Sequence, residues 1–164
     1  MQFIEMKVTG LTIDPFTSMP IIILKDIEDK AALPIWIGLI EASAIATELE
    51  HIQLSRPMTH DLLKNILDAA EIKVVKVTIT ELRDNTFYAS IVLSNAGKDM
   101  QMDARPSDAI AVALRTKSPI YVEKSVIEKS RKIDLGVNDS EQKQRKWTEI
   151  LESLSPEDFG KYKM

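Results

Sequence analysis

The fold of this chain is decided by residues 73–93, which read KVVKVTITELRDNTFYASIVL. In the first half of this stretch, valine and isoleucine alternate with lysine and threonine. Alternation with a period of two is typical of a strand that buries one face. The polar triplet Arg83-Asp84-Asn85 interrupts the pattern, and a second run begins at Thr86. The stretch therefore predicts two strands joined by a turn.

The same patterns predict further strands and three helices on either side of this pair. The remaining strands are expected at residues 3–13, 20–24, 33–37, 100–102 and 119–122. Helical spacing of apolar residues predicts helices at about 41–52, 59–70 and 107–116. In the second helix Thr59 is expected to be the N-cap. Its buried stripe is expected to comprise Leu62, Leu63, Ile66, Leu67 and Ala70.

The order of these elements repeats along the chain. Three strands followed by a helix are predicted twice, once in residues 8–49 and again in residues 75–114. A repeated order of this kind indicates a duplicated β-β-β-α unit. Such a unit predicts an α+β fold, in which helices pack against a mostly antiparallel sheet.

At 164 residues the chain has room for one domain with a short appendage. We expect the domain at residues 1–128, a polar linker at 129–140 and a helical tail at 141–164. The tail is expected to contain a C-terminal amphipathic helix with Trp147 at the centre of its apolar face. That face has to dock on its own domain or on a second subunit, and a homo-oligomer is expected.

Composition excludes several classes of protein. The chain contains no cysteine, which excludes disulfides, thiolate metal sites and cysteine nucleophiles. The N-terminus lacks the pattern of a signal peptide, and no apolar run approaches the ~20 residues that span a bilayer. A cytoplasmic protein is therefore expected. The net charge of −4 disfavours non-specific coating of nucleic acid, but it permits a nuclease with a locally basic site.

Two similar segments each place Arg-Pro directly before a predicted helix: RPMTHD at residues 56–61 and DARPSD at residues 103–108. Proline favours the first helical turn, where hydroxyl and carboxylate groups accept hydrogen bonds from unpaired N–H groups. An arginine at a helix N-terminus opposes the helix dipole, so it needs an anion nearby. The two segments therefore predict a phosphate-binding surface that comprises Arg56, Thr59, Arg105 and Ser107.

The same residues also have a purely structural interpretation. Thr59, Ser107 and the aspartates would then be helix caps. Arg56 and Arg105 would pair with Asp61, Asp103 or Asp108 in buried salt bridges. The sequence leaves this alternative open.

Other residues near the two segments suit catalysis. His60 is a candidate general base or acid near neutral pH, because histidine is the side chain that ordinarily changes charge in that range. Glu41, Asp103 and Asp108 stand at junctions between elements, where converging carboxylates can hold Mg²⁺ or Mn²⁺ for phosphodiester hydrolysis. The chain contains no phosphate-binding glycine loop, dinucleotide fingerprint, HExxH or G-x-S-x-G motif.

Five blocks of sequence occur in order along the predicted domain. They are LPIWIG (residues 33–38), RPMTHDLL (56–63), TFYA (86–89), DARPSDAIA (103–111) and PIYV (119–122). Together these blocks resemble the bifunctional nuclease domain of bacteria, archaea and plants. The resemblance implies a nuclease that acts on both RNA and DNA. It marks Arg56, His60, Asp61, Asp103, Arg105 and Asp108 as motif positions.

The leading hypothesis is therefore phosphodiester hydrolysis. Arg56 and Arg105 would hold phosphate with Thr59 and Ser107, and His60 would transfer a proton. The aspartates at positions 61, 103 and 108 complete the catalytic candidates. The alternative is a non-catalytic oligomeric module that binds a nucleotide or a regulatory partner through the same anion-binding surface.

Overall fold

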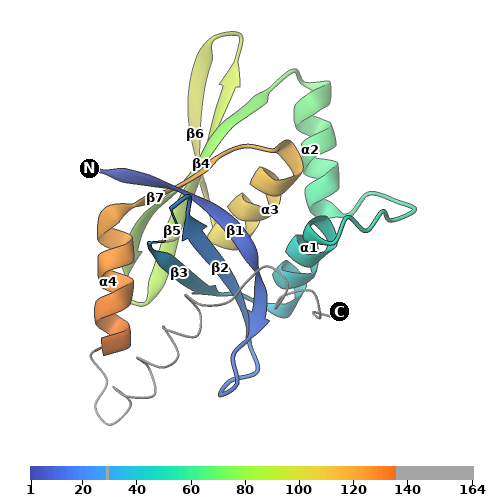
Figure 1. The fold of residues 1–164 in the computed structure, drawn as a ribbon. Helices are drawn as coiled ribbons and strands as arrows, with labels where there is room; N and C mark the ends of the chain where they lie inside the picture. Colours follow the sequence, from blue (N-terminus) through green and yellow to red (C-terminus); the bar gives the residue numbers. More distant parts are fainter. Residues whose placement is uncertain (29, 136–164) are drawn as a thin grey trace.

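The computed structural model describes residues 1–28 and 30–135. These residues form one sheet and four helices, labelled in chain order in Figure 1. The strands are β1 (Phe3–Ile13), β2 (Pro20–Asp26), β3 (Ala32–Trp36), β4 (Lys73–Arg83), β5 (Thr86–Asn95), β6 (Lys98–Ala104) and β7 (Ile120–Glu123). The helices are α1 (Leu39–Leu49), α2 (Thr59–Ala69), α3 (Pro106–Thr116) and α4 (Lys124–Leu135).

The seven strands follow the order β3-β2-β1-β7-β4-β5-β6 across the sheet. Neighbouring strands are antiparallel, except β4 and β7, which run parallel. Arg83 pairs with Thr86 across the predicted β4–β5 turn. Asp84 and Asn85 in that turn both have positive φ, as a tight two-residue hairpin turn requires. The predicted α+β fold with a mostly antiparallel sheet is confirmed.

Helices cover both faces of the sheet. α1 and α3 pack against each other and on β1, β2, β4 and β5, whereas α4 packs on β3, β4 and β7 from the opposite side (Figure 1). This double cover explains why residues 21–24 of β2 are entirely inaccessible to solvent. It also fixes α1 and α3, whose N-terminal ends carry Glu41 and Asp108.

The sequence prediction for α2 is wrong in two respects. Met58, not Thr59, is the N-cap, and the side chain of Asp61 accepts a hydrogen bond from its N–H at 3.0 Å. No residue of the helix is buried. Because α2 packs on α3 beyond the sheet, its apolar stripe faces solvent instead of the core. The exposed fractions are 51% for Leu62, 39% for Leu63 and 54% for Ile66.

Two runs of three strands and a helix are present, β1-β2-β3-α1 and β4-β5-β6-α3. Their origin by duplication stays a prediction. Helix α4 crosses the predicted domain end at residue 128, so residues 129–135 of the predicted linker are helical. The predicted amphipathic helix of the tail lies outside the described residues. None of the described helices is both long and apolar enough to cross a membrane.

Candidate functional site

A cavity of about 280 Å³ lies where four parts of the chain meet. They are the end of β3, the start of α1, the β4–β5 turn and the start of α3. Glu41, Arg105 and Ser107 contribute polar groups to its wall, and Trp36 and Phe87 contribute aromatic rings. The DARPSD segment therefore forms part of the cavity wall, and its Arg105 places a positively charged side chain there.

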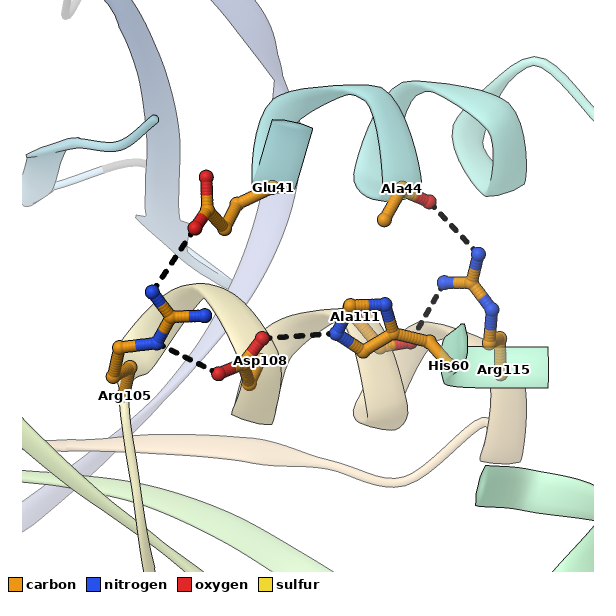
Figure 2. A network of polar contacts seen from close by, with 7 residues as sticks. All are labelled: Glu41, Ala44, His60, Arg105, Asp108, Ala111 and Arg115. Carbon is orange, nitrogen blue, oxygen red and sulfur yellow. Dashed lines mark hydrogen bonds and ion pairs between the residues drawn. The ribbon is translucent and has the colours of Figure 1, made fainter. Parts of the chain in front are cut away.

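Arg105 is the residue before α3, and Pro106 occupies the first position of the helix. Its extended backbone, with φ −68° and ψ 145°, is the conformation that a following proline favours. The guanidinium lies between α1 and α3 (Figure 2). Its Nε donates to Asp108 Oδ2 at 2.8 Å, and its Nη1 donates to Glu41 Oε1 at 3.0 Å. These two carboxylates, Asp108 foremost, raise the pKa of Arg105.

The exposure of Arg105 decides against the buried salt bridge of the structural interpretation. Its side chain is 65% exposed, although both of its partners are more buried. A charge pair so open to water contributes little to folding stability. The guanidinium is instead accessible to an anion in solution.

Asp108 holds a histidine as well as this arginine. Its Oδ1 lies 2.9 Å from Nε2 of His60, which belongs to the first turn of α2 and is 14% exposed (Figure 2). Burial raises the pKa of Asp108, but hydrogen bonds from Arg105 and His60 outweigh that effect. The pKa therefore lies below its ordinary value of 3.8, and the carboxylate is charged at neutral pH.

Asp61 has a different partner, Arg115. Its Oδ1 accepts a hydrogen bond from Arg115 Nε at 2.7 Å. Arg115 is 3% exposed, and it also donates to the carbonyls of Ala111 at 3.1 Å and Ala44 at 2.9 Å (Figure 2). Burial raises the pKa of Asp61, but the hydrogen bonds from Arg115 and from the N–H of Met58 outweigh that effect. The pKa of Asp61 therefore lies below its ordinary value. Arg115 thus ties α1, α2 and α3 together and holds the neighbouring His60 against α3.

Three predicted residues lie outside the cluster of linked side chains, which comprises Glu41, His60, Asp61, Arg105, Asp108 and Arg115. Arg56, Thr59 and Asp103 are exposed, and no hydrogen bond or ion pair links their side chains to it within the described part of the chain. Asp103 shares a face of β6 with Gln101, which donates to Ser90, because alternate residues of a strand lie on one face. That alternation turns Asp103 away from the side of Ala104.

The predicted metal ligands Glu41, Asp103 and Asp108 do not converge. Glu41 and Asp108 each bind Arg105, and Asp103 lies elsewhere. Within residues 1–28 and 30–135, no three histidine or acidic side chains are arranged to hold a metal ion. The residues do not fit the predicted Mg²⁺ or Mn²⁺ site, so no catalytic step is assigned to a metal.

Gly38 makes room for one partner of Arg105. A β-carbon at this position would overlap with the carboxylate of Glu41. The backbone of Gly38, with φ −72°, is accessible to other residues, so a larger residue here would require only that the flexible carboxylate of Glu41 move. Glycine therefore allows Glu41 to fold back towards Arg105.

Residues 22–134 of the chain match the sequence model of a family described as "Bifunctional nuclease domain". The chain belongs to the bifunctional nuclease domain family. The matched region contains Glu41, His60, Asp61, Arg105 and Asp108, so the whole cluster lies within the family domain. The resemblance seen in the sequence is confirmed.

Relatives of this bifunctional nuclease domain occur in bacteria and plants. An uncharacterised protein of Mycobacterium tuberculosis is 35% identical over 162 residues, which cover 94% of this chain and 97% of that protein. Bifunctional nuclease 1 of Arabidopsis thaliana is 33% identical over 110 residues, 64% of this chain and 34% of that protein. Bifunctional nuclease 2 of Oryza sativa subsp. japonica is 29% identical over 122 residues, 71% of this chain and 37% of that protein.

Sequence reasoning gave Arg115 no role in this bifunctional nuclease domain. The available signal was its context, because it ends the apolar run from Ala109 to Leu114 on a predicted helix. A charge on an apolar helix face calls for a buried partner. Local sequence patterns do not identify that partner, because Asp61 lies 54 residues earlier in the chain.

Proposed function

We propose that this domain hydrolyses phosphodiester bonds of RNA and DNA. Membership of the bifunctional nuclease domain family supports a nuclease. The observation that carries the proposal is the linkage of His60 and Arg105 through the single carboxylate of Asp108. One carboxylate thereby orients a proton-transfer group and an anion-binding group towards each other.

Each residue then has a definite task. Arg105 binds a non-bridging phosphate oxygen and stabilises the negative charge that develops at phosphorus. His60 accepts a proton from the attacking water through its other ring nitrogen, and Asp108 stabilises the imidazolium that forms. A new P–O bond forms from water as the bond to the leaving oxygen breaks. That oxygen takes a proton from solvent. Exposed Arg56 provides a second phosphate contact along the strand.

The assay that tests this proposal follows hydrolysis of labelled single-stranded RNA and DNA by highly purified protein. It includes Mg²⁺, Mn²⁺ and EDTA, because a requirement for a divalent cation stays a prediction. Arg105→Ala is expected to reduce hydrolysis about 10²-fold or more, as loss of one charge-stabilising donor does. Its melting temperature should not change, because the side chain is exposed.

Asp68→Asn is the matched control, because it removes an exposed ion pair with Lys64 on α2 and leaves the cluster intact. Equal hydrolysis by Arg105→Ala and wild type would place the activity elsewhere. The absence of hydrolysis by the wild type in every condition would reject the nuclease. Anion binding that persisted under those conditions would favour the non-catalytic module.

We further propose that the chain self-associates through the apolar stripe of α2, defined as Met58, Leu62, Leu63 and Ile66. These side chains recur at helical spacing, and all are exposed in the single chain. The acidic side chains of α2 are already paired, because Asp61 binds Arg115 and Asp68 binds Lys64, so the helix is poorly suited to bind a charged partner. A second copy supplies the same uncharged stripe by two-fold symmetry.

Sedimentation over a range of concentrations tests this association. The wild type is expected to sediment as a dimer or larger oligomer at micromolar concentration, and Leu62→Glu as a monomer. Asn95→Glu adds the same charge at the exposed end of β5 and should leave the oligomer unchanged. A wild type that stays monomeric at all concentrations contradicts the proposal.

A further inference from the structure

We propose that the cavity beside Arg105 is a nucleotide subsite, in which Ser107 and the start of α3 bind one phosphate and Trp36 stacks on the attached base. This inference rests on the proposed function, because it names the part of a nucleic acid that the site holds. It adds a base-binding residue to the residues that act in hydrolysis, and it places Ser107, which the sequence predicts to bind phosphate, in the same subsite.

Ser107 is the buried polar side chain of this cavity. It is 7% exposed and lines the cavity, and its hydroxyl makes no hydrogen bond within the described residues. A buried hydroxyl without a partner is costly, so such groups are rare unless a ligand or water completes them. An oxygen-rich ligand in the cavity would satisfy the hydroxyl of Ser107.

The groups around Ser107 determine which charge that ligand carries. Ser107 and Asp108 lie in the first turn of α3, whose N–H groups have no acceptor within the helix. A helix N-terminus with free N–H groups favours an anion, and the exposed guanidinium of Arg105 lines the same cavity. Glu41 also lines it, and its negative charge opposes any anion there, a polyphosphate more strongly than a single phosphate. The cavity therefore suits one phosphate and not a polyphosphate.

The other wall of the cavity contains the aromatic residue Trp36. Trp36 is 37% exposed, so part of its ring is open to a ligand. Its indole N–H donates to Asp14 Oδ2 at 2.8 Å, which fixes the ring. A fixed aromatic ring beside a cation and helix N–H groups matches a base joined to a phosphate, because bases stack on aromatic side chains irrespective of sequence. The volume of about 280 Å³ suits a ligand of mononucleotide size.

Calorimetric titration of the full chain with adenosine 5′-monophosphate, adenosine and inorganic phosphate tests the inference. The wild type should bind the mononucleotide about tenfold more tightly than phosphate, because of stacking. Trp36→Leu should remove this advantage and leave phosphate affinity unchanged. Ser107→Ala should lower the affinity for the mononucleotide and for phosphate by the same factor. Phe3→Leu, which removes an exposed aromatic ring outside the cavity, is the control.

Trp36→Leu also removes the hydrogen bond to Asp14, so Trp36→Phe serves as a second variant that keeps an aromatic face. It should retain most of the mononucleotide affinity. In a Trp147→Phe background, the mononucleotide should quench the fluorescence of Trp36, the remaining tryptophan. Equal wild-type affinity for mononucleotide and phosphate, or no quenching, overturns the inference.

The two proposals fail separately. Mononucleotide binding at Trp36 without any hydrolysis would reject the nuclease and keep the subsite in a binding module. Hydrolysis that depends on Arg105 and His60, with no mononucleotide preference in the titration, would keep the nuclease and reject the subsite.

Discussion

A protein that carries both His60→Ala and Asp108→Ala is expected to hydrolyse RNA and DNA at least 10²-fold, and up to about 10⁴-fold, more slowly than the wild type. The substitutions remove the candidate base and the carboxylate that orients it. They also release Arg105 from its partner at the start of α3. Initial rates on labelled single strands measure the effect.

Two controls give this result its meaning. Asp108→Asn keeps the shape of the side chain but loses its charge, and it should account for most of the decrease, because His60 and Arg105 depend on the same carboxylate. The melting temperature of each variant shows whether the domain is still folded. Wild-type rates in a folded double variant would point to a contaminant or to another site.

Replacement of Arg115 by methionine is expected to lower the free energy of unfolding by about 3 kcal/mol. Arg115 is 3% exposed, and its loss removes the hydrogen bonds that it donates to Asp61 and to the carbonyls of Ala44 and Ala111. Methionine fills a similar volume, so the missing hydrogen bonds dominate the effect. The value is at the lower end for a buried pair, because Asp61 is itself 32% exposed and regains water. Urea denaturation followed by circular dichroism measures it.

The pH dependence of this difference identifies its cause. The folded-state pKa of Asp61 is lowered, so its stabilising contribution is complete above the ordinary pKa of 3.8 and is lost as the pH falls through the folded-state pKa. The gap between wild type and Arg115→Met should therefore narrow below about pH 4. Arg105→Met, an exposed counterpart, should unfold like the wild type. A gap independent of pH would mean that packing, not the Asp61 pair, explains the loss.

The strands and most helices of this fold were predictable, because each has a clear local period. The β4–β5 hairpin combines alternation with turn residues that tolerate positive φ, and the structure contains it as predicted. Helix α2 shows the limit of such reasoning. Its apolar stripe correctly indicates an amphipathic helix, but periodicity does not say whether the chain itself covers the stripe.

The site was predictable as a set of residues and not as a set of pairs. Asp61 and Asp108 occupy similar places at the starts of two helices, yet one binds Arg115 and the other binds Arg105 and His60. That difference depends on how α1, α2 and α3 cross, which no local pattern encodes. Asp103 lies only two residues before Arg105, but strand alternation turns it to another face.

The position of β7 has a consequence for synthesis of the protein. β7 lies between β1 and β4 in the described sheet. Phe3, the first residue of β1, pairs with Glu123, the last residue of β7. On the ribosome, β1, β2 and β3 emerge long before this partner exists. The free edge of β1 is meanwhile open to pairing with other nascent chains. Completion of the sheet therefore waits until residue 123 has left the exit tunnel, and a chaperone that shields β1 should raise the yield of folded protein.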